Sequence, residues 1–391
     1  MMKKLKKAYK IEVKLAEEQT IKIHQTIGVS RFIYNFYIAH NKEVYEKEKR
    51  FVSGMDFSKW LNNEYIPNNE DKAWIKEVSS KATKQAIMNG EKAFKNFFHG
   101  KASFPKFKKK KNQDVKAYFP KNNKTDWTIE RHRVKVPTLG WIRFKEFGYI
   151  PDKSIVKSGT VSQKANRYYV SILVEEDVKH DNSNEHCEGI GVDLGLKDFA
   201  ICSNGMTKKN INKTKAVKKV EKKLKREQRK LSRKYESLKL RNKKKKGEAT
   251  RQNIQKQIVN VQKLHQRLTN IRTDYINKTV RELIKQKPSF ITIEDLNVSG
   301  IMKNKHLAKA VAQQKFYEFR TKLISKAKQN NIEIRIVDRW YPSSKLCSCC
   351  GAYKKDLKLS DRVYKCSCGL VINRDLNASI NLVNAKKYKI A

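Results

Sequence analysis

The stretch Gly-Ile-Gly-Val-Asp-Leu-Gly at residues 189–195 decides the fold class of the second half of the chain. Its apolar residues predict a buried strand, and the strand ends on an acid, Asp193. A glycine then allows a tight turn into a second predicted strand at residues 199–202. The pattern predicts an α/β domain whose first hairpin presents a carboxylate at one edge of a sheet.

Two further acids lie at comparable positions farther along the chain. Glu294 ends the apolar run at residues 290–293, which predicts a strand buried on both faces, and Asp375 opens a helical stretch that would pack on the same sheet. An acid at the end of a strand that turns into a hairpin is how RNase H-like folds present their first metal ligand. Each acid taken alone is more often a surface or capping residue, but three of them in separate motifs predict one site.

Such a site would suit the hydrolysis of phosphodiesters. That reaction needs two cations about 4 Å apart, which activate water and stabilise the leaving oxygen. Carboxylate oxygens are hard ligands that suit Mg²⁺ or Mn²⁺. The sequence therefore predicts a metal-dependent endonuclease with two Mg²⁺ or Mn²⁺ ions bound by Asp193, Glu294 and Asp375.

Five of the seven cysteines lie between residues 347 and 368. Cys347 and Cys350 form a CxxC pair, and Cys366 and Cys368 form a CxC pair, which is close to the pattern in which two tight turns supply four thiolates to a tetrahedral Zn²⁺. A closed site of four thiolates would be structural. Cys349 could replace Cys350, so the spacing leaves the choice between these two ligands open.

The charge of the chain indicates a polyanionic partner. Its 88 lysines and arginines against 39 acids give a formal net charge of +49, spread along the whole length. No apolar run approaches the roughly 18 residues that a membrane-spanning helix needs. We therefore expect a cytoplasmic, nucleic-acid-binding protein that is not attached to a membrane.

Two basic segments are the strongest candidates for contacts with nucleic acid. Residues 213–246 hold 18 lysines and arginines against three acids and keep an apolar stripe, so one face would pack while the other binds phosphate. Residues 104–111 interleave aromatic and basic side chains, a pattern that could stack bases but would also fit a disordered linker. The candidate contacts are Lys106, Lys108, Lys109, Lys222, Lys225, Arg226, Arg229, Lys230 and Arg233.

The pattern of apolar residues predicts a mixed β and α/β chain of several domains. Residues 1–16 and about 101–180 read as short strands, which suggests a small β-barrel, and residues 17–100 read as a helical insertion into it. A polar segment links this region to an α/β domain at residues 188–391. Within that domain, residues 212–287 predict a hairpin of two helices with Gly247 in its turn.

Several motifs together resemble the TnpB (OrfB-type) proteins of insertion sequences, relatives of type V CRISPR effectors. The likeness covers most of the chain. It is carried by residues 26–35, by Phe-Pro-Lys-Phe-Lys at 104–108, by Gly-Val-Asp-Leu-Gly at 191–195, by Ile-Glu-Asp-Leu at 293–296, by Pro-Ser-Ser-Lys at 342–345 and by Arg-Asp-Leu-Asn-Ala at 374–378.

This resemblance implies a discontinuous RuvC-like nuclease domain with Asp193, Glu294 and Asp375 as its metal ligands. It also implies a zinc ribbon inserted at about residues 342–371. The barrel would be a wedge domain, and the helical insertion a recognition domain. In the family these parts bind a guide RNA and read a short motif beside the double-stranded DNA target, and the guide selects the target by base pairing.

The leading hypothesis is therefore an RNA-guided DNA endonuclease encoded by a transposable element. The alternative is a guide-dependent DNA-binding repressor, or a transposition accessory protein, that does not cut. Loss of an acidic ligand would favour the alternative, and this sequence retains all three acids. Two positions depart from the family pattern: Asn373 stands where an aspartate is usual, and the second cysteine pair is one residue short.

Overall fold

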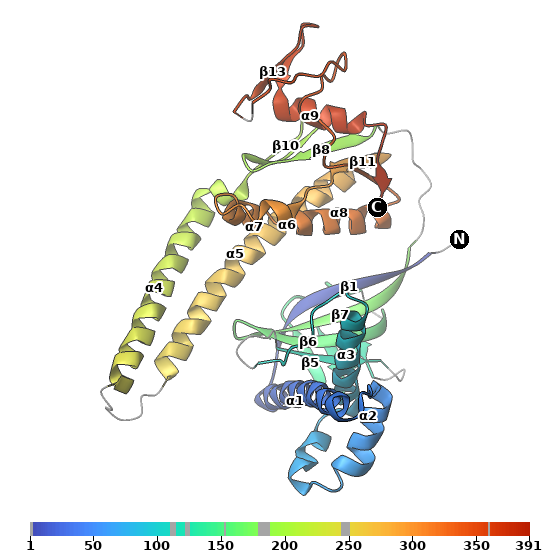
Figure 1. Ribbon diagram of the computed structural model, residues 1–391, viewed down its shortest axis with the longest axis vertical. Coiled ribbons are helices and arrows are strands. Elements are labelled where there is room, and N and C mark those ends of the chain that lie inside the picture. Colours follow the sequence, from blue (N-terminus) through green and yellow to red (C-terminus); the bar gives the residue numbers. More distant parts are fainter. Residues whose placement is uncertain are drawn as a thin grey trace. The chain divides into compact units, whose positions relative to one another are not determined.

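The computed structural model describes residues 3–109, 115–121, 126–151, 154–178, 188–243, 251–358 and 360–391. The chain divides into two compact units, of which the first ends at Val178 and the second follows it (Figure 1).

The N-terminal unit contains a seven-stranded antiparallel sheet. Alternation of apolar and polar residues predicts strand β1, and its Tyr9, Ile11 and Val13 are indeed buried in the core. The strand order is β2-β6-β7-β1-β5-β4-β3, and because no described pairing joins β2 to β3, a closed barrel stays a prediction. The strands are β1 (Lys3–Lys14), β2 (Val115–Pro120), β3 (Thr128–Ile129), β4 (Arg133–Val136), β5 (Gly140–Phe144), β6 (Ile155–Lys164) and β7 (Arg167–Val178).

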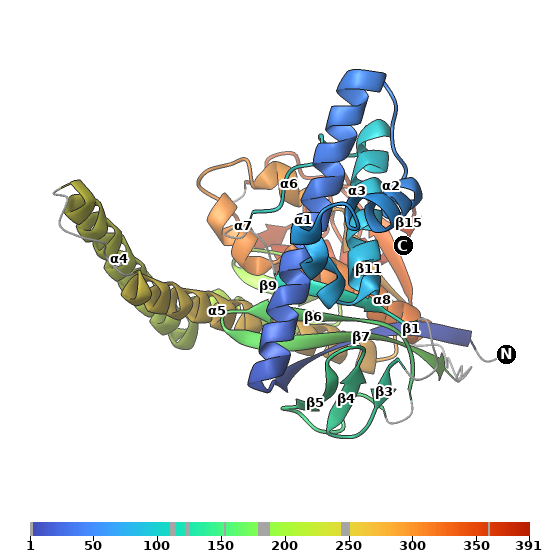
Figure 2. The same ribbon diagram turned by 90° about the horizontal axis from the view of Figure 1, so that it is seen from below.

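Helices fill residues 17–98 of the same unit and have a hydrophobic core of their own. Figure 2 shows the long helix α1 with α2 and α3 beside it. Buried aromatic rings join these three helices, since Phe57 contacts Tyr37 and Tyr37 contacts Phe94 edge to face. The elements are α1 (Glu17–Glu48), α2 (Gly54–Trp60), a π-helical turn (Leu61–Tyr65), a 3₁₀ helix (Glu70–Glu77) and α3 (Ser80–Phe98).

The C-terminal unit is built on a six-stranded mixed sheet of order β10-β9-β8-β11-β12-β15. The first three strands form an antiparallel meander, as the hairpin motif predicts, and β8, β11 and β12 are parallel. Helix α9 (Arg374–Val383) lies on one face of this sheet, while α8 (Phe316–Gln329) and the end of α5 (Gln252–Lys285) cover the other (Figure 1). The strands are β8 (Ile190–Leu194), β9 (Asp198–Cys202), β10 (Thr207–Lys209), β11 (Phe290–Glu294), β12 (Glu333–Val337) and β15 (Lys389–Ile390).

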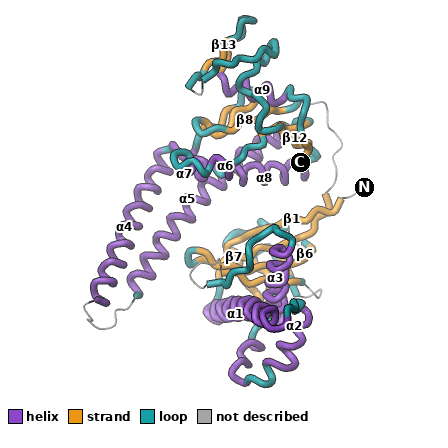
Figure 3. The backbone as a smooth tube through the Cα atoms, viewed as in Figure 1, coloured by secondary structure: helices purple, strands orange, loops and turns teal. Residues whose placement is uncertain are grey.

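Two long antiparallel helices, α4 (Lys215–Lys243) and α5 (Gln252–Lys285), form the predicted hairpin (Figure 3). Their apolar stripes meet in a small core that includes Val220, Leu224 and Leu264. The predicted turn residue Gly247 lies outside the described residues. The other elements are a 3₁₀ turn (Ile211–Lys213), α6 (Val298–Ile301), α7 (Ala308–Gln314), α8 (Phe316–Gln329), α9 (Arg374–Val383) and the hairpin β13 (Val363–Lys365) and β14 (Val371–Asn373).

Helix α9 lies unusually close to strand β8 because Gly191 has no side chain. A Cβ atom placed on Gly191 would lie 2.0 Å from the backbone carbonyl oxygen of Ser379 in the middle of α9. That oxygen belongs to a helical backbone and cannot turn away. The separation of the helix from the sheet therefore depends on the glycine.

None of the described helices has the length and apolar character needed to cross a membrane.

We predict that Gly191→Ala destabilises the C-terminal unit by about 3 kcal/mol, because the added methyl group must push α9 off the sheet. Hydrogen exchange of β8 and α9, together with urea unfolding, measures the effect. Gly28→Ala is the matched control, since no atom lies within 4 Å of a Cβ placed at this helical glycine. It should instead stabilise α1 by about 0.5–1 kcal/mol. Unchanged exchange in β8 of the Gly191 variant would contradict the steric argument.

Candidate active site and metal-binding cluster

Asp193 and Glu294 lie side by side at the carboxyl ends of two parallel strands. Val192 pairs with Ile293 in the register of β8 and β11, so the next residues, Asp193 and Glu294, lie at the same edge of the sheet. Glu294 is the last residue of β11, and Asp193 is the last but one of β8. In open α/β sheets the carboxyl ends of the strands form the crevice where ligands bind. The strand pattern of the sequence thus positions two of the three predicted acids.

The third acid, Asp375, comes from the first turn of α9. The side chain of Asn373 caps this helix, accepting hydrogen bonds from the backbone N–H groups of Asp375 at 2.9 Å and Leu376 at 3.2 Å. Asparagine and aspartate are equally good at this capping position. The departure from the family pattern at Asn373 therefore leaves the start of the helix intact.

The electrostatics of the site couple Asp193 to each of the other two acids. Burial raises the pKa of Asp193 to about 7, and the nearby charges of Asp375 and Glu294 add to the increase. Burial, with a smaller contribution from Asp295, also raises the pKa of Glu294 to about 7. Removing acids from water and bringing them together disfavours their charged forms. A bound cation would reverse that penalty.

Arg374 holds Asp375 in this arrangement, a contact that the sequence analysis missed. Its guanidinium donates from Nε at 3.2 Å and from Nη2 at 3.0 Å to Oδ1 of Asp375. Arg362 lies 3.8 Å from the other carboxylate oxygen. Among the described residues, the four cysteines lie close enough together to share one metal ion, whereas the oxygen atoms of the three carboxylates do not.

The four cysteines of the two predicted pairs come together. The sulfur atoms of Cys347 and Cys368 lie 3.6 Å apart, those of Cys350 and Cys366 also lie 3.6 Å apart, and all four lie within 4.8 Å of one another. A tetrahedral Zn²⁺ with bonds of 2.3 Å requires sulfur separations of about 3.8 Å. Cys349 is exposed and outside this group. The residues therefore fit a zinc ion, and the geometry favours Cys350 over Cys349.

The second cysteine pair, Cys366 and Cys368, still forms a tight turn although it is one residue shorter than a CxxC pair. Gly369 has a positive φ of 89°, and the backbone of residues 366–370 closes through a hydrogen bond from Cys366 N–H to Leu370 O at 2.9 Å. A hydrogen bond from the backbone N–H of Cys368 lowers the pKa of Cys366, whereas hydrogen bonding with Cys366 raises the pKa values of Cys350 and Cys368, as expected for thiols close enough to share protons. The CxC spacing is thus compatible with a thiolate ligand.

Two buried asparagines of α9 fasten the helix to the cysteine cluster. Asn377 accepts the backbone N–H of Ser348 at 3.0 Å and donates to the carbonyl of Leu346 at 2.6 Å. One turn later, Asn381 donates to the carbonyls of Ser343 at 2.7 Å and Leu346 at 2.8 Å. The first cysteine turn and the helix that carries Asp375 therefore share one hydrogen-bond network.

The predicted basic contacts on α4 are all exposed: Lys222, Lys225, Arg226, Arg229, Lys230 and Arg233. Two of them, Arg226 and Lys230, approach Glu227, at 3.8 Å and 3.1 Å. Glu227 itself faces α5 and accepts a hydrogen bond from Gln257 at 2.9 Å. The apolar stripe packs while the basic face is free to meet a polyanion.

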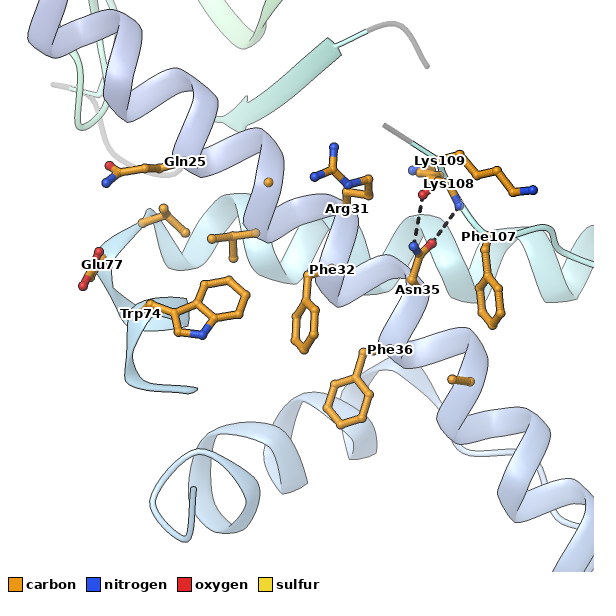
Figure 4. A pocket seen from close by; sticks show the side chains of 14 residues that line it. Gln25, Arg31, Phe32, Asn35, Phe36, Trp74, Glu77, Phe107, Lys108 and Lys109 are labelled. Atoms are coloured by element: carbon orange, nitrogen blue, oxygen red, sulfur yellow. Dashed lines mark hydrogen bonds between the residues drawn. The ribbon is translucent and has the colours of Figure 1, made fainter. Parts of the chain in front are cut away.

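In the N-terminal unit, residues 107–109 lie against α1 rather than forming a free linker (Figure 4). Asn35 holds the backbone of Lys108 with two hydrogen bonds of 2.8 Å and 3.1 Å, and Lys108 Nζ lies 3.7 Å from the centroid of the Tyr34 ring. A groove of about 890 Å³ runs along this contact, lined among others by Phe32, Trp74 and Phe107. Lys106 and Lys109 are exposed.

Three family models match parts of the chain. The model described as "Probable transposase" (OrfB, IS605) matches residues 170–305, and the model described as "Cas12f1-like, TNB domain" matches residues 316–382. A third, described as "Helix-turn-helix domain", matches residues 1–50. In this structure the described part of that last segment is a strand followed by one helix of 32 residues, not a helix-turn-helix.

Two relatives align with almost the whole chain. "Putative RNA-guided DNA endonuclease InsQ" of Escherichia coli is 30% identical over 403 residues, covering 98% of this chain and 93% of the relative. A "Putative RNA-guided DNA endonuclease" of Streptomyces pristinaespiralis is 29% identical and covers 98% of this chain and 90% of its own length.

A similar fold is found in the protein of the "Cryo-EM structure of the Cas12f1-sgRNA-target DNA complex". It aligns with a TM-score of 0.56 at 14% identity, over 99% of this chain and 100% of the other. The resemblance inferred from the motifs is thereby confirmed at the level of sequence and fold. The chain belongs to the OrfB (IS605) family of TnpB-type proteins.

Proposed function

We propose that this protein is an RNA-guided DNA endonuclease, and that Asp193, Glu294 and Asp375 form its cutting centre. The observation that carries the proposal is the placement of Asp193 and Glu294 at the carboxyl ends of adjacent strands, with Asp375 close enough to act on Asp193. Burial, with smaller contributions from the charges of Asp375 and Glu294, raises the pKa of Asp193 to about 7. The two relatives that align over nearly their whole length are both named "Putative RNA-guided DNA endonuclease".

The three carboxylates fit hard divalent cations, because they offer oxygen ligands and a bound cation would favour the charged forms of Asp193 and Glu294, whose pKa values burial raises. When bound, two such Mg²⁺ or Mn²⁺ ions would supply an activated water and stabilise the leaving oxygen of a phosphodiester. Arg374 would act on Asp375 by holding its carboxylate in place while the site is empty. Asn373 would set the position of Asp375 by capping α9.

The cysteine cluster would bind one Zn²⁺ and act as a structural element. Four thiolates complete a tetrahedron and leave no open position for a substrate. Through Asn377 and Asn381 the cluster holds α9, so its contribution to cutting would be to keep Asp375 in place.

The basic surfaces would hold the guide RNA and the DNA. The exposed lysines and arginines of α4 and of residues 106–109 would contact phosphates, while base pairing with the guide would select the sequence. In this proposal residues 1–16 and 101–180 form the wedge domain that helps to read a short motif beside the target. Residues 17–100 form the recognition domain, and residues 188–391 form the nuclease domain.

The test is guided cleavage by the purified protein loaded with an RNA whose 3′ segment matches a DNA target. Changing that segment should move the cut. Asp193→Ala, Glu294→Ala and Asp375→Ala should each lower the cleavage rate about 1,000-fold, because each loses several kcal/mol of transition-state stabilisation, while target binding stays nearly unchanged.

Asp274→Ala, which removes an exposed acid of α5, serves as the control and should cut at the normal rate. Efficient cutting of one fixed sequence without RNA would refute the guided function. Strong residual cutting by any of the three variants would refute the assignment of that residue.

The raised pKa of Asp193 predicts a stability effect with a defined sign. The folded pKa lies near 7 and the ordinary value near 3.8, so ionisation of Asp193 destabilises the fold increasingly as the pH rises from about 4 to 7. Asp193→Asn should therefore raise the melting temperature of Mg²⁺-free, zinc-loaded protein by about 2–8 °C at pH 8. The gain should shrink toward pH 5. Adding Mg²⁺ at pH 8 should stabilise the wild type but not Asp193→Asn. If the two proteins have the same melting temperature at pH 8 without Mg²⁺, ionisation of Asp193 does not destabilise the fold.

The zinc assignment predicts different behaviour for neighbouring cysteines. Purified wild-type protein should contain about one zinc per chain by elemental analysis. Cys347→Ser should lose the metal and destabilise α9, because Cys347 is a buried member of the cluster. Cys349→Ser should keep the metal and the wild-type melting temperature. Retention of zinc by the Cys347 variant, or its loss from the Cys349 variant, would overturn the ligand set.

A further inference from the structure

A pocket of about 420 Å³ opens beside Glu294, at the same carboxyl edge of the sheet as the cutting centre. Leu194 at the end of β8 and Glu294 at the end of β11 form part of its wall. The segment that follows β11 and the start of α8 enclose the rest. Its volume falls within the range of about 300–1,000 Å³ that is usual for sites of small organic groups.

The lining of this pocket is apolar and aromatic on one side. Leu296, Val298 and Phe316 form the apolar part, and Tyr317 stands at the rim with 72% of its surface exposed. An aromatic ring left so exposed beside an apolar pocket gains little from folding. It is suited to stack on a flat ring, and nucleobases are such rings.

The polar part of the lining includes two arginines besides Glu294, Asn297 and Ser299. Arg320 Nη1 lies 2.5 Å from one carboxylate oxygen of Asp295, and Arg339 Nη2 lies 3.0 Å from the other. The hydrogen bond from Arg320 is the largest cause of the lowered pKa of Asp295, with Arg339 adding to it, so this acid remains charged. Two guanidinium groups against one carboxylate leave a positive charge next to Glu294. That charge offsets the repulsion that the acids of the cutting centre exert on DNA phosphates.

We propose that this pocket takes the base of an unpaired nucleotide in the DNA strand being cut. Tyr317 stacks on that base, and Arg320 and Arg339 lie next to its phosphate. The inference rests on the proposed function and names a base-binding subsite beside the cutting centre. A base inside a duplex is paired and stacked on both faces, so it cannot enter the pocket without leaving the helix.

The first test is guided cleavage of targets that carry one abasic nucleotide, moved step by step past the cut. In the wild type, one position next to the cut should lower the rate about tenfold when its base is missing, which corresponds to the loss of one stacking contact. Tyr317→Ala should cut intact DNA about tenfold more slowly and lose all sensitivity to the abasic position. Tyr317→Phe should behave as the wild type.

Tyr353→Ala is the matched control, because Tyr353 is a half-exposed tyrosine that does not line the pocket. It should keep both the normal rate and the normal abasic sensitivity. Full cutting of intact DNA by Tyr317→Ala, or an abasic effect that survives in that variant, would overturn the proposal while leaving guided cleavage intact.

The second test does not depend on cutting. A single-stranded oligonucleotide that carries 5-iodouracil is bound to full-length Asp193→Ala protein and irradiated, and the crosslinked peptide is identified by mass spectrometry. The expected crosslink lies on Tyr317 and disappears in the Asp193→Ala, Tyr317→Ala double variant. Crosslinks confined to other segments would overturn the pocket assignment, whether or not the wild type cuts guided targets.

Discussion

The close contact between helix α9 and strand β8 at Gly191 is the constraint on which the C-terminal unit depends. The carbonyl oxygen of Ser379 occupies the space that a side chain at position 191 would need, so the helix lies directly on the sheet. Its first turn then brings Asp375 within electrostatic reach of Asp193. The opposite side of the same helix receives the first cysteine turn through Asn377 and Asn381. One ten-residue helix thus joins the sheet, the third acid and the cysteine cluster.

The site combines two opposing electrostatic requirements. A net charge of +49 attracts nucleic acid to the protein, and the basic face of α4 concentrates part of that charge. The proposed cutting centre instead gathers acids, and the raised pKa values of Asp193 and Glu294, caused mainly by burial, show that their charged forms are disfavoured there. The sheet holds these acids in positions that they would not adopt alone. If they are the metal ligands, the site reduces the stability of the metal-free fold, as is common where stability and activity conflict.

The sequence was most informative where a short-range pattern determines the structure. Apolar runs that end on acids located β8 and β11, and cysteine spacing located the four residues that meet in the cluster. Contacts between residues far apart in the sequence could not be predicted from such patterns. Glu294 and Asp295 are adjacent and both acidic, yet the pKa of the first is raised and that of the second is lowered. Burial raises the pKa of Glu294, whereas Arg320 and Arg339, which are 25 and 44 residues away from Asp295, lower that of Asp295. Likewise, the choice of Cys350 over Cys349 required the positions of the sulfur atoms, and closure of the N-terminal sheet depends on strand pairings that no local pattern specifies.

The order of the three acids along the chain has a consequence for synthesis of the protein. Asp193 and Glu294 emerge from the ribosome before Asp375, and both the basic helix α4 and the first cysteine turn also come earlier. With Asp193, Glu294 and Asp375 as the proposed cutting centre, a nascent chain would attract nucleic acid before that centre is complete. Because α9 must dock on β8 and on the cysteine turn to bring in the last acid, a partly synthesised chain would bind phosphate but would not cut it. The discontinuity of the proposed site would thus delay a potentially harmful activity until the docking helix has been made.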